Sequence, residues 1–171
     1  SGAYRAQILH AVRHRTEIDA ILGQYRTKKT SPAKAATQQK PGGPDDAAEL
    51  EAAEGSGAAA EDDGSGGSAG YFPYRPYCAG CEKDFTTVTA YDDDTTRMTY
   101  VCTACGHSET VQLAEFDRGK LVWKVDWPMR WAYEGVVFEP SGVDHTSPGS
   151  SFQVGGQIVT EIFGGRQPIG P

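Results

Sequence analysis

Four cysteines make up the most informative chemical pattern in this sequence. They are the only cysteines among 171 residues, and they occur as two C-x2-C pairs, Cys78 with Cys81 and Cys102 with Cys105. A C-x2-C turn presents two thiolates on one side of a tight knuckle, and two knuckles supply the four sulfurs that a tetrahedral zinc ion binds at ~2.3 Å. The spacing therefore predicts one zinc ion held by these four side chains.

The predicted zinc site is structural rather than catalytic. Four protein thiolates close the coordination sphere and leave no open position for water or substrate. His107 follows the second knuckle, but the four cysteines already complete the set, so we expect this histidine to be a bystander. Two disulfides, or two pairs of free thiols, are the alternatives. The N-terminal residues show no export signal, and this favours metal ligands over disulfides.

The residues between the two knuckles predict a β-hairpin. Residues 85–91 are rich in threonine, valine and aromatic side chains, Asp92 to Asp94 form a turn, and residues 97–101 return. β-branched and aromatic residues favour strands, and clustered aspartates favour turns. Gly80 and Gly106 stand where each knuckle turns sharply, and we expect both to need a positive φ. The unit is typical of a zinc ribbon, which is too small to hold a core without its metal.

A second group of chemically active residues follows at 120–145. The three tryptophans of the chain, at positions 123, 127 and 131, lie within nine residues, and Asp126, Arg130, Asp144 and His145 are set among or after them. These residues fit either a packed hydrophobic core or a pocket for a cationic or nucleotide-like ligand. The pocket is considered because a buried carboxylate among aromatic rings is costly unless it is paired. The turn from Gly142 to His145 precedes a predicted helix start, where a ribose or phosphate is favoured.

The elements that must position these groups are short. Residues 4–26 repeat apolar side chains at helical spacing and predict an amphipathic helix. Its basic face is either solvated or in contact with phosphate. Two strands are predicted at 121–125 and 136–138, and a second helix from 147–149 to Phe163 in spite of Gly155 and Gly156.

Charge is unevenly distributed along the chain. The net charge is −7, yet residues 41–70 hold eight acids and no base. Removing those eight from the 23 acids leaves 15 against 16 bases, a net charge of +1, so the acidic composition does not exclude a nucleic-acid partner. Residues 27–70 carry Leu50 as their only large apolar side chain and predict a disordered linker. No apolar run approaches the ~18–20 residues of a membrane span.

The run Trp123-Lys-Val-Asp-Trp-Pro-Met-Arg-Trp131, followed by Glu139-Pro-Ser-Gly-Val-Asp-His145, closely resembles the archaeal-type class I lysyl-tRNA synthetases. The order of the basic helix, the two knuckles and Ile162-Phe163-Gly164 resembles the same family, and only the linker falls outside the resemblance. The resemblance implies an α/β fold, part of a Rossmann-type class I synthetase catalytic domain with an inserted zinc-ribbon-like subdomain. Four segments are then expected: a basic amphipathic helix at 1–26, the linker at 27–70, the zinc ribbon at 71–119, and a partial nucleotide-binding catalytic segment at 120–171.

The resemblance also implies an activity and a set of site residues. Such enzymes are cytoplasmic, join lysine to ATP with Mg²⁺, and pass the lysyl group to the 3′ end of tRNA(Lys). By similarity, Trp123 is a wall of the amino-acid pocket, Asp126 and His145 are its polar residues, and Gly142 and Asp144 meet the adenosine ribose. Trp123 and Asp126 are three residues apart and point to opposite faces of an ideal strand. Either the strand ends or bulges between them, or only one of them faces lysine.

The sequence departs from the family pattern in one respect. The H-I-G-H-like and K-M-S-K-like motifs that clamp the ATP phosphates are absent, so no complete catalytic set is present. We therefore expect these residues to be an internal fragment that is inactive alone. The alternatives are a non-catalytic zinc-ribbon RNA-binding module, with Tyr71, Tyr74 and Tyr77 as base-stacking residues, and a ligase-derived paralogue that binds only an amino acid or a nucleotide.

Overall fold

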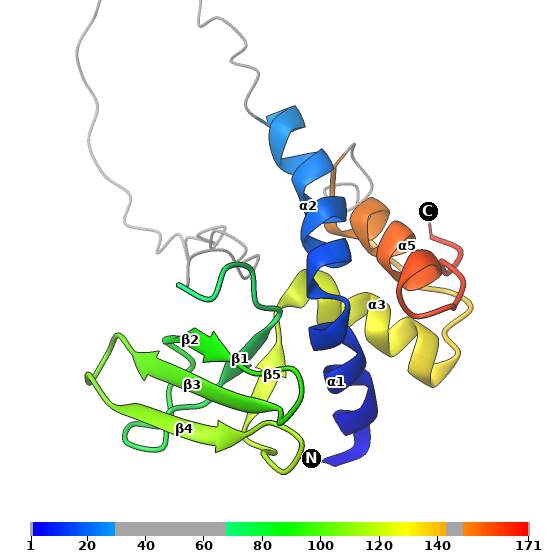
Figure 1. Cartoon of the computed structure of the whole chain (residues 1–171). Helices are drawn as coiled ribbons and strands as arrows, with labels where there is room; N and C mark the ends of the chain where they lie inside the picture. The colour runs from blue at the N-terminus through cyan, green and yellow to red at the C-terminus, as the bar shows by residue number, and fades with distance from the viewer. Residues whose placement is uncertain (1, 30–67, 143–148, 171) are drawn as a thin grey trace, which may run out of the picture.

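A computed structural model describes residues 2–29, 68–142 and 149–170 (Figure 1). Helices gather on one side, a three-stranded sheet lies on the other, and a two-stranded ribbon runs between them (Figure 1). Most of the predicted linker, residues 30–67, lies outside the described residues. This mixed helix and sheet architecture agrees with the predicted fold class.

The N-terminal segment forms two helices rather than the single helix predicted. A 3-10 turn at Gly2–Tyr4 leads into α1 (Arg5–Arg13), and α2 (Arg15–Lys29) follows directly. The break falls at His14, whose φ of −95° and ψ of 21° lie off the helical values. The predicted apolar face is confirmed, because Val12, Ile18, Ile21 and Leu22 are buried. The second helix also runs three residues beyond the predicted boundary at Arg26.

The cysteine segment forms the predicted hairpin and adds a third strand. β2 (Thr86–Tyr91) pairs with β3 (Arg97–Cys102), and β3 pairs with β4 (Ser108–Gln112), all antiparallel. One face of this sheet is buried against the helices through Val88, Met98 and Tyr100. β4 was not predicted, because its sequence Ser-Glu-Thr-Val-Gln has no fully buried residue.

The strand predicted at 121–125 is wrong beyond its first residue. β1 (Tyr74–Pro76) pairs with β5 (Gly119–Leu121), and Val122 then caps α3 (Trp123–Glu134). The carbonyl oxygen of Val122 accepts the N–H groups of Val125 and Asp126 at 2.9 and 2.8 Å, which starts the helix. The four-residue tryptophan spacing, a helical period, therefore outweighs the β-propensity of the valines.

The strand predicted at 136–138 is also absent. Phe138 instead makes a single parallel bridge to Ile169, in which the N–H of Glu139 donates to Ile169 O and the N–H of Ile169 donates to Val137 O, both at 3.0 Å. Gly135, in the left-handed conformation at φ 65°, ends α3 just before this segment.

The C-terminal helix α5 (Ser151–Glu161) starts slightly later than predicted. Ser150 is its N-cap and accepts the N–H of Gln153. Gly155 lies inside this helix because α5 crosses close to α3: a Cβ there would lie 2.9 Å from the Trp131 ring. Gly156 faces the end of the flexible Gln167 side chain, which confines it less strictly. The two glycines that weakened the helix prediction are therefore packing residues.

The Gly155 contact leads to a matched pair of alanine substitutions. Gly155→Ala should destabilise the protein by ~1–2 kcal/mol, because overpacking against Trp131 exceeds the gain in helix propensity. Gly23→Ala on α2, where a Cβ meets nothing within 4 Å, should stabilise by ~0.5–1 kcal/mol. Thermal unfolding of both variants checks this, and a stabilised Gly155→Ala protein contradicts the close packing of α3 and α5.

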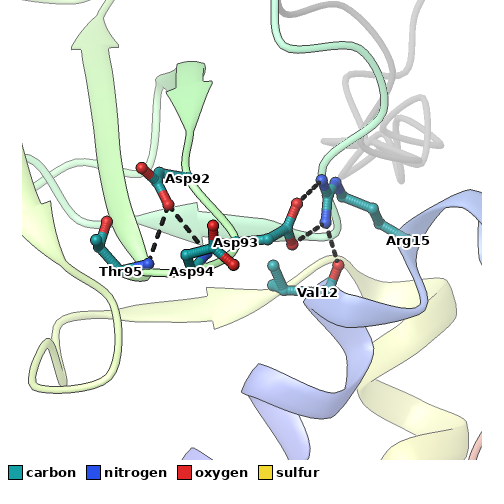
Figure 2. Close-up of polar contacts among 6 residues, drawn as sticks. All are labelled: Val12, Arg15, Asp92, Asp93, Asp94 and Thr95. Carbon is teal, nitrogen blue, oxygen red and sulfur yellow. Dashed lines mark hydrogen bonds and ion pairs between the residues drawn. The ribbon is translucent and has the colours of Figure 1, made fainter.

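The turn of the β2–β3 hairpin is attached to the helices by one arginine. Arg15, at the start of α2, donates to both carboxylate oxygens of Asp93 at 2.7 and 2.6 Å and to Val12 O at 2.9 Å (Figure 2). Its guanidinium also lies 5.4 Å from the centre of the Tyr91 ring. The helix break at His14 thus places a cation where it satisfies a helix-end carbonyl and holds the hairpin turn.

Asp93 and Asp94 give a controlled test of this attachment. The Arg15 guanidinium beside Asp93 lowers the pKa of that carboxyl, so the ion pair stabilises above the ordinary aspartate pKa and is lost as pH falls through the lowered value. Because the pair is partly exposed, Asp93→Asn should cost only about 1 kcal/mol. Hydrogen exchange of β2 and β3 amides in the full-length protein should rise at neutral pH, and the difference from wild type should vanish in acid.

Asp94→Asn is the matched control for Asp93→Asn. It removes the same charge one residue later. Arg15 bonds to the carboxylate of Asp93 and not to that of Asp94, whose backbone N–H donates to Asp92 Oδ1 at 2.9 Å (Figure 2). Equal exchange in the two variants would show that overall charge, and not the bidentate pair, holds the hairpin turn.

Candidate functional site

The four cysteines converge as the sequence predicted. Their sulfurs all lie within 4.8 Å of one another, and the Cys78–Cys105 and Cys81–Cys102 pairs are each 3.6 Å apart. None of the four is in a disulfide. Sulfurs at ~2.3 Å from a tetrahedral ion lie a little under 4 Å apart, so this set can hold a metal ion. Thiolates are the ligands that zinc prefers in structural sites.

The two knuckles share one backbone pattern. In the first, the N–H of Cys78 donates to Lys83 O, and the N–H of Glu82 donates to Cys78 O. In the second, the N–H of Cys102 donates to His107 O, and the N–H of Gly106 donates to Cys102 O. The same turn therefore positions both pairs of ligands.

The position that needs a positive φ is the fifth residue of each knuckle. It is Gly106 at 75° in the second knuckle and Glu82 at 60° in the first. The expectation is therefore confirmed for Gly106 and wrong for Gly80, which is not in the left-handed region. In the first knuckle a non-glycine residue accepts the less favourable conformation.

The backbone also favours thiolate at one ligand. Burial raises the pKa of Cys102, but hydrogen bonds from the N–H groups of Cys105 and Ala104, together with those from the Cys81 and Cys105 side chains, lower that pKa to about 7. His107 lies outside the cluster: its Nε2 is 3.8 Å from a carboxylate oxygen of Glu109, and the only metal-compatible group in the described ranges consists of the four cysteines. This agrees with a bystander role.

The three tryptophans form a ladder along α3. The Trp123 and Trp127 rings are stacked with centroids 5.1 Å apart, and Trp127 and Trp131 are 4.9 Å apart. Trp131 is 2% exposed, packs on Phe152, and donates its indole N–H to Glu139, whereas Trp123 is 47% exposed. The inner end of the ladder is thus hydrophobic core, and the outer end is available to a ligand.

Asp126 lies near Trp123 but is already paired. On a helix, residues three apart share a face, so the opposition expected for a strand does not arise. The Asp126 carboxylate accepts from Arg130 Nε at 2.7 Å, and the Arg130 guanidinium lies over the Tyr4 ring at 5.2 Å. A carboxylate among aromatic rings is costly unless it is paired, and the ion pair with Arg130, one turn along α3, offsets that cost for Asp126.

Of the three remaining predicted pocket residues, the structure describes Gly142. Gly142 is exposed, with nothing within 4 Å of the position of a Cβ. Asp144 and His145 lie outside the described residues. The structure therefore places Trp123 and Asp126 on one face of α3, and Gly142, the other predicted pocket residue that it describes, has no neighbour within 4 Å of its Cβ position.

One of the three tyrosines proposed for RNA stacking is buried and cannot stack on a base. Tyr74 is 2% exposed, and Tyr71 packs against the core with the Arg26 guanidinium 5.9 Å from its ring centre. The stacking assigned to the RNA-binding alternative is wrong for Tyr74.

Sequence reasoning also missed Glu139 as the partner of Trp131 and Arg15 as the partner of Asp93, since pairing between segments leaves no periodic signal.

A comparison with known protein families identifies the family to which this chain belongs. The family described as tRNA synthetases class I (K) matches residues 1–171, the whole chain. The chain belongs to this family. The resemblance stated from the tryptophan segment and the two knuckles is confirmed.

Class I (K) synthetases from distant organisms are similar to this chain. A lysine–tRNA ligase of Streptomyces coelicolor is 80% identical over 171 residues, all of this chain and 28% of the relative. Lysine–tRNA ligase 1 of Methanosarcina acetivorans is 49% identical over 98 residues, 57% of this chain and 18% of the relative. A lysine–tRNA ligase of Borreliella burgdorferi is 32% identical over 169 residues, 99% of this chain and 25% of the relative. The matches thus cover only 18–28% of the length of these synthetases.

No helix in the described residues of this synthetase segment is both long and apolar enough to cross a membrane.

Proposed function

We propose that this chain is part of a lysine–tRNA ligase that activates lysine with ATP and transfers it to the 3′ end of tRNA(Lys). The 80% identity over the whole chain to a relative named lysine–tRNA ligase carries this proposal. In the proposed reaction, the lysine carboxylate attacks the α-phosphate of ATP, which bears Mg²⁺, and pyrophosphate leaves. A ribose hydroxyl of the tRNA then attacks the lysyl carbonyl, and AMP leaves. The segment is inactive alone in this proposal, because the phosphate-clamping motifs are not in its sequence.

The metal of the cysteine cluster is proposed to be zinc with a structural role. Four thiolates at ribbon spacing support zinc over harder cations, which prefer oxygen ligands. The ion would supply the cross-link between the two knuckles, and the chain contributes the turns that aim the sulfurs. We propose a cytoplasmic enzyme, in keeping with cysteines that are not in disulfides.

Trp123 is proposed as a wall of the lysine site. Its ring is stacked on Trp127 on one side and 47% exposed overall, so a ligand has access to the indole. An ammonium or its alkyl stem over an indole face gains ~0.5–2 kcal/mol. Asp126 is proposed as a supporting residue that fixes Arg130, while His145, Gly142 and Asp144 are kept as proposed contacts to lysine and to the adenosine ribose.

The division of the chain into four segments is likewise a proposal. The parallel bridge between Phe138 and Ile169 supports the assignment of 120–171 to a parallel nucleotide-binding sheet, because parallel pairing is the pattern of that fold. Val137, Phe138 and Ile169 are 78%, 60% and 74% exposed. Strands of such a sheet are normally covered on both faces. We propose that the rest of the longer protein covers these three side chains.

The test of the proposed function is aminoacylation by the full-length protein. Purified protein with ATP and Mg²⁺ should attach labelled lysine to tRNA(Lys) and should not attach ornithine or arginine at a comparable rate. A protein that retains its metal and its fold but charges no tRNA with lysine would refute the proposal.

A further inference from the structure

The four cysteine ligands differ in their access to solvent. Cys78 and Cys102 are fully buried, Cys81 is half-buried, and Cys105 is exposed. Oxidation of a thiolate by a small molecule follows its access as well as its charge. A solvent-borne oxidant therefore reaches the cluster first at Cys105.

One close partner of Cys105 lies in the other knuckle. Its sulfur is 3.6 Å from that of Cys78, and the second cross-knuckle pair, Cys81 and Cys102, is at the same distance. Each knuckle is held by its own pair of backbone hydrogen bonds, which fix the two cysteines of that knuckle on one turn. A disulfide between the knuckles requires each cross-knuckle pair of sulfurs to approach from 3.6 Å to ~2.05 Å.

We propose that Cys105 is an oxidation site, at which two-electron oxidants such as hydrogen peroxide form a Cys78–Cys105 disulfide and release the metal. The inference rests on the metal proposed above. It assigns different roles to the ligands: Cys105 is oxidised first, Cys78 then forms the disulfide with it, and Cys81 and Cys102 are left with an ion that two thiolates hold weakly.

The electrons and atoms of this step balance. The Cys105 thiolate attacks one peroxide oxygen, the O–O bond breaks, and hydroxide leaves, which gives the sulfenic acid at Cys105. The Cys78 thiolate then attacks that sulfur, the S–O bond breaks, and a second hydroxide leaves as the S–S bond forms. The two sulfurs together lose the two electrons that the peroxide gains.

The experiment uses the full-length, metal-loaded protein. Hydrogen peroxide is added in the presence of a coloured zinc chelator, and samples are alkylated and mapped by mass spectrometry over time. The expected first product is the Cys78–Cys105 disulfide, formed in step with metal release. A first disulfide within a knuckle, Cys78–Cys81 or Cys102–Cys105, overturns the proposal.

A glycine variant tests access without removing a ligand. A Cβ at Gly80 would lie 3.6 Å from the Cys105 sulfur and 3.4 Å from the Cβ of His107, and Gly80 does not need a positive φ. Gly80→Ala therefore places a methyl group beside the exposed sulfur. Peroxide-driven metal release should slow by about threefold, because reactivity depends on exposure of the thiolate. Gly23→Ala, whose Cβ meets nothing within 4 Å, should release metal at the wild-type rate.

The outcomes separate this proposal from the proposed function. Metal analysis before oxidation tests the metal itself, and tRNA charging tests the enzyme. If the metal and charging are present but Gly80→Ala releases metal as fast as wild type, with its metal content unchanged, then Cys105 is not the point of attack and the inference fails.

Discussion

Loss of one buried cysteine ligand is expected to remove the metal and unfold the zinc-ribbon end of the molecule. Cys102→Ser should reduce bound zinc from about one per chain to none, since a structural site uses all four ligands. Zinc binding supplies on the order of 10 kcal/mol in small zinc domains, which is comparable to the whole stability of a typical folded domain. In the full-length protein, amides of β2, β3 and β4 should lose most of their protection from hydrogen exchange, and those of α5 should lose much less.

His107→Ala is the matched control for the cysteine variant. His107 follows the same knuckle, and its ring lies 6.4 Å from that of Tyr100, but it is not among the clustered sulfurs. This variant should keep its zinc and its ribbon amides protected. Loss of zinc from His107→Ala would make the histidine a ligand and overturn the four-thiolate site.

The metal knuckles were predictable because ligand chemistry fixes both residue type and spacing. Two thiolates on one turn require C-x2-C, and the hairpin between the pairs follows from threonines, valines and an aspartate turn. The third strand of the sheet was not predictable, since Ser108–Gln112 carries no fully buried side chain and its pairing with β3 comes from tertiary contact. Strand propensity depends on such contacts more than on the strand itself.

The segment after β5 shows how two local signals compete. Valines at 122 and 125 favour a strand, while tryptophans at 123, 127 and 131 repeat at a helical interval. The helix prevails because its tryptophan face meets Phe152 of α5, and Gly155 lets the two helices approach. Neither fact is visible in the segment alone. For the same reason, Trp131 is core and Trp123 is a site candidate, although the two have the same residue type.

Removal of the exposed indole is expected to impair lysine use more than stability. Trp123→Ala in the full-length protein should lower kcat/KM for lysine by more than about tenfold, which corresponds to ~1.4 kcal/mol of transition-state stabilisation. The melting temperature should change little, because Trp123 is 47% exposed and its ring stacks on Trp127 near the surface end of the tryptophan row. Trp123→Phe should recover part of the activity, since a smaller aromatic face still receives a cation.

Tyr133 supplies the control on the same helix. It is 46% exposed, almost the same as Trp123, and its ring packs on Tyr4 at 4.9 Å rather than on the tryptophan ladder. Tyr133→Ala removes a similar aromatic surface from α3 and should leave kcat/KM for lysine within about twofold of wild type. If both variants lose activity equally, or if Trp123→Ala loses activity only in proportion to unfolding, then Trp123 stabilises α3 and does not contact lysine. A selective loss in Trp123→Ala, partly restored by phenylalanine, places the lysine side chain at the outer end of the ladder.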